Sequence, residues 1–235
     1  MTENKVEILR DQLDYRTNEA YKALRTNIQF CGDDIKVISV TSCTPNEGKS
    51  SVSFNMAMSF AENGKRVILV DADLRKSVLI GRYKVGEINS GLTHYLSGQN
   101  ELEDSVYHTD EQNLDMIFCG SYSPNPVELL SHSRFEAMIS KLRGEYDYVI
   151  IDTPPLGSVI DGAIVAKAVD GVIIVIETNA ISYRFAQSVK EQLEKTNCRI
   201  LGVVMNKVPM DKKKYYGKYY GKYYGKYYGT YGKKN

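Results

Sequence analysis

Ten consecutive residues at 41–50, Thr-Ser-Cys-Thr-Pro-Asn-Glu-Gly-Lys-Ser, have the composition of a phosphate-binding loop. An apolar run precedes them and a segment with helical spacing follows, so that backbone N–H groups at a helix start would face an anion. In such a loop Gly48 lets the backbone approach the phosphates, Lys49 bridges the β- and γ-phosphates, and Ser50 ligates Mg²⁺. Cys43 stands where the usual pattern has its first glycine. The alternative is a chance Gly-Lys-Ser in a surface turn, and the predicted strand and helix on either side argue against it.

Three aspartates stand at or near the ends of two other apolar runs. Asp71 and Asp73 end one run, with Arg75 just behind them, and Asp152 ends another. In parallel α/β sheets, ligands bind beyond the carboxyl ends of the strands, at the edge where a phosphate loop also lies. Mg²⁺ takes one or two carboxylates with phosphate oxygens and waters, which leaves one carboxylate to orient or deprotonate an acceptor hydroxyl. One aspartate alone would be an ordinary strand-end cap, but three with the phosphate loop predict a nucleoside triphosphate site.

Strands and helices that could position these residues alternate along the chain. Apolar, often β-branched runs of strand length occur at 35–42, 66–73, 114–119, 146–152, 171–177 and 199–206. Helical spacing occurs at 17–30, 50–63, 134–143, 158–168 and 182–195. Several strands are apolar at successive positions, which is typical of strands covered on both faces. The pattern predicts an α/β domain with a mostly parallel sheet sandwiched by helices, and leaves the strand order open.

The motifs CTPNEGKS at 43–50, VILVDADLR at 67–75 and VIIDTPP at 149–155, followed by a tyrosine-rich C-terminus, resemble those of a known family. That family is the bacterial protein-tyrosine kinases of capsular and exopolysaccharide synthesis, and the resemblance covers essentially the whole chain. The second motif and the tyrosine cluster separate it from other P-loop proteins. The resemblance implies a P-loop domain related to the MinD/ParA ATPases. It also implies a free-standing kinase of the Gram-positive type, whose membrane-spanning activator is a separate polypeptide.

The same resemblance implies a role for each motif. Asp71 would act on the tyrosine hydroxyl, while Asp73 and Asp152 would hold Mg²⁺ directly or through water, together with Ser50. The catalytic residues expected from the family are Asp71, Lys49, Asp73 and Arg75. The residues expected to contact ATP are those of the phosphate loop and, from its position alone, one residue past the last strand: Thr44, Pro45, Asn46, Glu47, Gly48, Lys49, Ser50, Ser51 and Asn206.

The segment 211–235 differs from the rest of the chain. It repeats Lys-Tyr-Tyr-Gly four times and has a net charge of +7, against −6 for residues 1–210. The segment has no aliphatic side chains, and each four-residue repeat contains a glycine, so it cannot form a core. We therefore predict a disordered tail. A basic arm that binds nucleic acid or an anionic membrane is one interpretation. The resemblance favours another, in which the tail offers phosphate acceptors to a neighbouring subunit: Tyr215, Tyr216, Tyr219, Tyr220, Tyr223, Tyr224, Tyr227, Tyr228 and Tyr231.

An N-terminal helix carries a charged triplet, Glu19, Lys22 and Arg25, spaced by three. It resembles the family motif Glu-x2-Arg-x2-Arg, which mediates contacts between subunits of a ring. Lys22 replaces the first arginine and lacks its bidentate fork. The alternative is a solvated charged face. The expected organisation is an N-terminal segment at 1–16, a kinase domain at 17–210 that includes the oligomerisation helix at 17–30, and the tail at 211–235.

Composition limits the class of protein. With 43% hydrophobic and 25% charged residues, the chain is neither collagen-like nor globally disordered. No apolar run reaches the roughly 18 residues of a membrane helix, and the N-terminus lacks a signal-peptide core. Four cysteines without a CxxC pair suit reduced thiols. We expect a cytoplasmic protein that a transmembrane partner recruits to the inner face of the membrane, with a phosphotyrosine phosphatase as a further partner and no nucleic acid.

The predicted function is that of an ATP-dependent protein-tyrosine autokinase that modifies its own tail and regulates capsular or exopolysaccharide synthesis. One alternative is a MinD/ParA-like ATPase, although that class carries an additional lysine where this chain has Thr44. Another is an ATP-binding scaffold of a membrane assembly complex. An ATPase with a nucleic-acid-binding tail is the third.

Overall fold

Eight strands form one sheet in the computed structural model of this protein, which describes residues 4–209. Across the sheet their order is β1-β4-β5-β3-β6-β2-β7-β8, and every neighbouring pair is parallel except β4 with β5. The predicted mostly parallel sheet is therefore confirmed. The strands are β1 Lys5–Val6, β2 Val37–Ser42, β3 Val67–Asp71, β4 Tyr107–Thr109, β5 Leu114–Ile117, β6 Tyr148–Asp152, β7 Gly171–Glu177 and β8 Ile200–Asn206.

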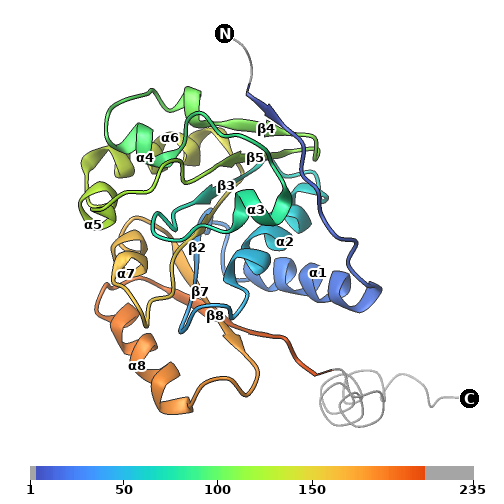
Figure 1. Cartoon of the computed structure of the whole chain (residues 1–235). Coiled ribbons are helices and arrows are strands. Elements are labelled where there is room, and N and C mark those ends of the chain that lie inside the picture. The colour runs from blue at the N-terminus through green and yellow to red at the C-terminus, as the bar shows by residue number, and fades with distance from the viewer. Residues whose placement is uncertain (1–3, 210–235) are drawn as a thin grey trace, which may run out of the picture.

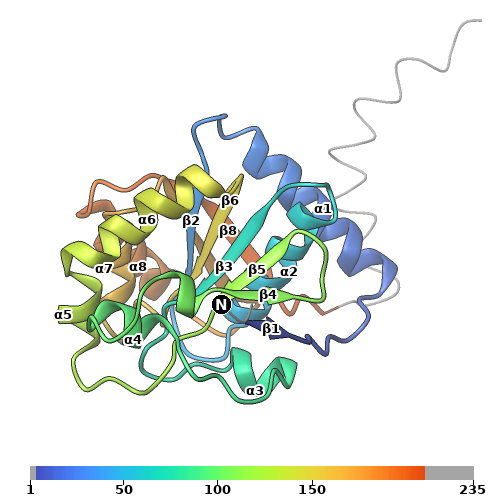
Figure 2. The same ribbon diagram turned by 90° about the horizontal axis from the view of Figure 1, so that it is seen from above.

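Helices cover both faces of this sheet (Figure 1). Helices α1 and α2 lie on one face, and α6, α7 and α8 lie on the other, as the view from above also shows (Figure 2). The helices are α1 Tyr15–Gln29, α2 Lys49–Ala61, α3 Leu79–Tyr83, α4 Leu92–Leu96, α5 Pro126–Leu130, α6 Ser133–Glu145, α7 Asp161–Ala166 and α8 Tyr183–Glu194, with a short 3₁₀ turn at Glu103–Ser105. No helix within residues 4–209 is both long and apolar enough to cross a membrane.

The central strands are buried on both faces, as their continuous apolar runs predict. All residues of β2 and β3 are buried. Successive side chains of β3 enter opposite cores: Leu69 packs on the side of α1 and α2, while Ile68 and Val70 pack on the side of α4 and α6. This two-sided burial fixes the pleat of β3, because a shift by one residue would exchange the two cores.

The sequence patterns did not predict the shortest strands and helices. The strands β1 and β4 have two and three residues, and the helices α3, α4 and α5 have five each, too few to show a period. The segment 1–16, expected to lie outside the kinase domain, contributes β1 to the sheet through its pairing with β4. Helix α1 begins at Tyr15, two residues earlier than predicted, because the Asp14 carboxylate caps the N–H groups of Arg16 and Thr17.

The sheet brings the predicted motifs to one edge. Strands β2, β3 and β6 are neighbours and parallel, so their carboxyl ends meet. The phosphate loop follows β2, and Asp71, the last residue of β3, is in register with Asp152, the last residue of β6. The predicted tail and its tyrosines at 211–235 lie outside the described residues.

Candidate nucleotide site

The loop between β2 and α2 contains two residues with positive φ. Asn46 (φ +66°) and Gly48 (φ +95°) turn the chain just before α2 begins at Lys49. A Cβ atom on residue 48 would lie 2.1 Å from Nδ2 of Asn206, so a larger residue would require that side chain to move. The Asn206 amide donates to the Glu47 carbonyl oxygen at 2.9 Å and ties the loop to the end of β8. The loop thus lies against the first turn of α2, where an anion would meet N–H groups.

Lys49 makes ion pairs with two of the three predicted aspartates. Its Nζ lies 2.9 Å from Oδ2 of Asp73 and 3.8 Å from Oδ2 of Asp152, and all three side chains are buried. Nζ also donates to Oγ of Ser50 at 3.3 Å. Burial lowers the pKa of Lys49, but the charges of Asp152 and Asp73 outweigh it and hold the pKa above its usual value. A charged ammonium group therefore lies where the loop meets the carboxylates.

Asp71 has no exposed surface. Its Oδ2 accepts a hydrogen bond from Oγ of Ser77, and its Oδ1 accepts one from the N–H of Asp73 at 3.3 Å. Burial, reinforced by the charge of Asp152, raises the pKa of Asp71 to about 7. Burial also raises the pKa of Asp152, whose Oδ1 accepts from Oγ of Ser53 at 3.1 Å. A carboxyl group that titrates near neutrality is suited to general acid–base chemistry.

Arg75, in the loop after β3, is held by a carboxylate from a distant part of the chain. Its Nε donates to Oδ2 of Asp161 at 2.8 Å and its Nη2 donates to Oδ1 at 3.0 Å, a bidentate pair. Asp161 is the first residue of α7. The hydrogen bond to Asp161 raises the pKa of Arg75. The sequence motif containing Arg75 is thus connected to α7 as well as to the phosphate loop.

A cavity of about 640 Å³ opens in front of the phosphate loop. Lys49, Ser50, Asp73 and Arg75 contribute to its wall, and so do three further cationic residues that were not predicted: Lys76, Arg82 and Lys207. Asp71 and Asp152 lie buried outside this lining. A cavity lined by so many cations favours an anionic ligand with several charges, such as a triphosphate.

The predicted metal ligands supply the donors that Mg²⁺ prefers. The Ser50 hydroxyl and the Asp73 and Asp152 carboxylates are hard oxygen ligands grouped around the Lys49 ammonium. Within residues 4–209, no group of three His, Cys, Asp or Glu side chains could hold a metal ion by itself. Mg²⁺ in nucleotide sites takes only one or two carboxylates and completes its shell with phosphate oxygens and water. These residues therefore fit a Mg²⁺ ion that enters with a nucleotide.

Two predicted nucleotide contacts, Thr44 and Glu47, do not line the cavity. The Glu47 carboxylate is buried inside the loop, where it accepts from the N–H of Thr44 at 2.7 Å and from the N–H of Glu177 at 3.3 Å. Glu47 therefore stabilises the shape of the loop and occupies the N–H of Thr44. The other predicted contacts do line the cavity: Pro45, Asn46, Gly48, Lys49, Ser50, Ser51 and Asn206.

The charged triplet of α1 does not share one exposed face. Nζ of Lys22 lies 2.8 Å from Oε1 of Glu19 in an exposed pair. Arg25 instead contacts α2 of its own chain, where its Nη1 donates to the Ser59 carbonyl oxygen at 2.5 Å. Spacing by three could not reveal this difference, because it follows from how α1 packs on α2. The role of the triplet in subunit contacts stays a prediction.

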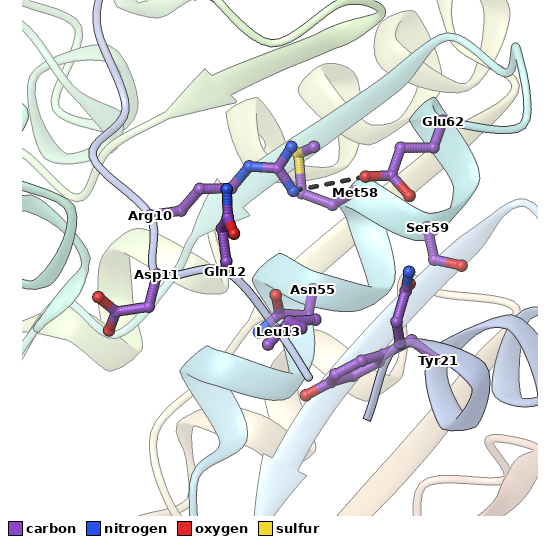
Figure 3. A pocket seen from close by; sticks show the side chains of 10 residues that line it. Arg10, Asp11, Gln12, Leu13, Tyr21, Asn55, Met58, Ser59 and Glu62 are labelled. Atoms are coloured by element: carbon purple, nitrogen blue, oxygen red, sulfur yellow. Dashed lines mark hydrogen bonds and ion pairs between the residues drawn. The ribbon is translucent and has the colours of Figure 1, made fainter. Parts of the chain in front are cut away.

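A second cavity of about 350 Å³ lies between the N-terminal segment and helices α1 and α2 (Figure 3). Arg10 reaches across it to Glu62, with Nη1 3.4 Å from Oε1. Tyr21 and Asn55 also line it. None of the predicted nucleotide or metal ligands contributes to its wall, so it is separate from the nucleotide cavity.

Several residues of the site were not predicted. Ser53 and Ser77 hydrogen-bond to Asp152 and Asp71, Arg82 donates to Oγ of Ser51, and Asp161 holds Arg75. Ser53 has a usable sequence signal, since it follows Lys49 by one helical turn and therefore faces the same side. The others come from a loop and from the short helices α3 and α7, whose placement depends on the tertiary fold.

Comparisons with known proteins identify the family of this chain. The AAA domain family matches residues 35–201. The tyrosine-protein kinase CpsD of Streptococcus pneumoniae serotype 4 is 45% identical over 212 residues, which cover 89% of this chain and 93% of the relative.

Solved structures show the same relationship. The chimerical protein CapA2B2 superposes with a TM-score of 0.80 at 30% identity, over 87% of this chain and 93% of the other. The septum site-determining protein MinD of Pyrococcus horikoshii, solved with Mg-ADP, gives 0.63 at 26% identity, over 73% and 70%. The P-loop fold is thus shared with MinD, while identity and coverage are higher for the kinases. The chain belongs to the bacterial protein-tyrosine kinases and has their P-loop NTPase fold.

Proposed function

We propose that this chain transfers the γ-phosphate of ATP to tyrosines 215–231 of a neighbouring copy and thereby regulates capsular or exopolysaccharide synthesis. The observation that supports this most directly is the buried cluster of Lys49, Asp71, Asp73 and Asp152 beside a cationic cavity. The cluster combines a phosphate-binding cation, hard oxygen ligands and one carboxyl group with a pKa near neutrality. A phosphate-binding lysine, oxygen ligands for a metal ion and a carboxylate that orients or deprotonates the acceptor hydroxyl are recurring parts of kinase sites.

In this mechanism the phosphate loop and Lys49 bind and orient the triphosphate. Ser50, Asp73 and Asp152 would hold Mg²⁺ directly or through water, and the ion would neutralise phosphate charge. A bond forms between the tyrosine oxygen and the γ-phosphorus, the bond to the β-phosphate breaks, and ADP leaves. Phosphoryl transfer depends mainly on positioning and charge stabilisation, so a strong base is not required.

Asp71 accepts the proton of the tyrosine hydroxyl. Its pKa of about 7 lies between that of an ordinary aspartate and the reference value near 10 for tyrosine. Asp71 is fully buried and its Oδ2 already accepts from Ser77, so the side chains around it have to rearrange before the acceptor hydroxyl can reach it.

Charge assists delivery of the tail. Residues 211–235 carry +7 and residues 1–210 carry −6, so the tail of one copy is attracted to the body of another. Each phosphotyrosine adds about −1.5 to −2 charges, and four of them cancel the charge of the tail. Phosphorylation then weakens the attachment of the tail and loosens the oligomer. Mass photometry of dephosphorylated and phosphorylated protein tests this, and identical size distributions would contradict it.

The same proposal includes the partners of the enzyme. The subunits form a ring through α1, and a separate transmembrane activator recruits the ring to the inner face of the membrane. A phosphotyrosine phosphatase reverses the modification. Support for a membrane partner comes from the EpsB relative of Ralstonia nicotianae, a putative tyrosine-protein kinase in which a match over 85% of this chain covers only 27% of the longer protein.

The proposal is tested by incubating dephosphorylated protein with Mg²⁺-ATP and reading phosphotyrosine by mass spectrometry. Lys49→Met and a truncation after Met210 serve as controls, each with and without the cytoplasmic segment of the candidate activator. Phosphate on tyrosines 215–231 that is absent in Lys49→Met supports the proposal. ATP hydrolysis without phosphotyrosine, with the activator present, would contradict it and favour a MinD/ParA-like ATPase.

A further inference from the structure

The Arg75–Asp161 pair is built differently from an ordinary surface ion pair. Asp161 is 0% exposed, whereas 37% of the Arg75 side chain is exposed and lines the nucleotide cavity. Two parallel hydrogen bonds join them, at 2.8 and 3.0 Å. A buried carboxylate without a cationic partner is strongly unfavourable, so Asp161 holds the guanidinium of Arg75 in place.

This arrangement leaves part of the guanidinium available. Arg75 uses Nε and Nη2 for Asp161, and within residues 4–209 its Nη1 has no hydrogen-bond acceptor. Arg75 lines the same cavity as Lys49, Ser50 and Asp73. A long arginine side chain on a loop has many rotamers, and the planar bidentate contact removes most of that freedom before a ligand binds.

A second arginine–aspartate pair lies away from the nucleotide cavity and provides a comparison. Arg143 donates to Asp170 through Nη1 and Nη2 at 2.9 and 2.7 Å, and its side chain is also 37% exposed. Asp170, however, is the residue before β7, at the opposite edge of the sheet, where it also accepts the N–H groups of Lys36 and Val37. Arg143 lines no wall of the nucleotide cavity.

We propose that Asp161 is a positioning residue that fixes Arg75 so that Nη1 donates to the phosphoryl group during transfer. The inference rests on the proposed kinase function and assigns to Asp161 a part in it. Charge on the phosphoryl oxygens is spread in the transition state, and a donor that is already oriented stabilises it without reorganisation. Asp161 acts only through Arg75, which distinguishes it from the residues that contact the substrate.

The test compares matched variants of the two pairs in the full chain. Asp161→Asn and Arg75→Lys each disrupt the bidentate arginine–aspartate pair at the cavity. Asp170→Asn and Arg143→Lys each disrupt the matching pair at the opposite edge. We expect kcat for phosphotyrosine formation to fall about 100-fold in the first two, with KM for ATP changed less than about threefold. The second two should lose thermal stability and keep kcat. The double variant Asp161→Asn/Arg75→Ala should be no slower than Arg75→Ala alone.

Several outcomes would overturn the inference. Equal kcat in Asp161→Asn and Asp170→Asn would make Asp161 a structural residue, as would a further loss of rate in the double variant. Should Asp161→Asn not fold, Arg75→Lys against Arg143→Lys gives the same comparison with side chains that are half-exposed. If the wild type hydrolyses ATP but forms no phosphotyrosine, the proposed kinase function fails. The hydrolysis rates of the same variants then decide on Asp161 separately.

Discussion

The sheet has an amino edge, where its parallel strands begin, and a carboxyl edge, where they end. The two edges use the same residue types in opposite ways. At the amino edge, Asp170 accepts two backbone N–H groups and both ends of a guanidinium, and these hydrogen bonds keep its pKa low although burial raises it. At the carboxyl edge, burial and the charges of neighbouring aspartates raise the pKa values of Asp71 and Asp152, despite the ammonium of Lys49. The charge of Asp170 is fully hydrogen-bonded, whereas the charges of Asp71 and Asp152 are under-compensated.

This difference separates stability from function. Charges that are fully hydrogen-bonded stabilise the fold and have no capacity left for a ligand. Like charges buried together are destabilising, and they persist where a cation or a substrate compensates them. The carboxyl edge therefore has the properties of a binding site, whereas the ion pair at the amino edge stabilises the fold. The contrast can be tested by replacing one aspartate at each edge.

The largest effect is expected at Asp71. Asp71→Asn keeps the shape of the side chain but removes the proton acceptor, so phosphotyrosine formation should fall at least about 100-fold. The same change removes one of several buried like charges, and the free energy of unfolding should rise. Quantitative mass spectrometry and urea denaturation measure the two effects. Full activity, or a loss of stability, would contradict the assignment of this edge as a functional one.

The stability gained in Asp71→Asn should depend on pH. The native pKa is about 7 and the unfolded value is near 4, so the native state binds the proton more tightly. Wild-type stability contributed by this group is therefore lost as the pH rises from about 4 to 7. The variant should exceed the wild type by more at pH 8 than at pH 5, measured without Mg²⁺. A pH-independent difference would exclude a raised pKa at this position.

Gly48→Ala should weaken both the fold and the site. A side chain at φ +95° is strained, and its Cβ would lie 2.1 Å from the Asn206 amide. We expect a loss of about 1–3 kcal/mol in the free energy of unfolding. The shift of the melting temperature by Mg²⁺-ATP should also shrink. Gly64→Ala is the control, because that glycine also has positive φ but nothing lies within 4 Å of the added Cβ. If the shift of the melting temperature by Mg²⁺-ATP fell equally in both variants, the loop would not be part of the nucleotide site.

Asp170→Asn should have a smaller effect, confined to stability. The carboxylate is partly exposed, so after allowance for solvent screening we expect a loss of about 1–2 kcal/mol. Because the native pKa is depressed, this contribution is present above the unfolded value near 4 and is lost as the pH falls through the native pKa. Wild type and variant should therefore converge in acid. Autophosphorylation at pH 7.5 should be unchanged, and a large loss would erase the distinction between the edges.

The sequence predicted the charged residues at the carboxyl edge but not those at the amino edge. Spacing identified Lys49, Asp71 and Asp152 because a phosphate loop and strand-end aspartates form a recognisable pattern. Asp170 shows no such pattern, since an aspartate before a strand is common in any protein. Its partner Arg143 lies far away in the sequence, as Asp161 does from Arg75. Pairs of this kind depend on how helices pack, and local periodicity carries no information about that.

Strands show the same limit. The long central strands were predicted within a few residues, and β7 at Gly171–Glu177 matches its predicted bounds. Their continuous apolar runs reflect burial on both faces, which is a local property of the sequence. The short strands form because β1 pairs with β4 and β4 also pairs with β5, not because their own residues require it. Tertiary pairing therefore explains most of what the sequence missed.

The smallest effect is expected on the exposed face of α1, which lies away from both edges. Glu19 and Lys22 form a solvent-exposed pair, so Lys22→Ala should leave the unfolding midpoint of the monomer unchanged. Lys22→Arg restores the guanidinium fork of the family motif and should raise the oligomeric fraction of the dephosphorylated protein, measured by mass photometry at several concentrations. Lys22→Ala should lower that fraction. If neither substitution changes the fraction, this face of α1 is only a solvated surface, and subunit contacts have to be sought elsewhere on the molecule.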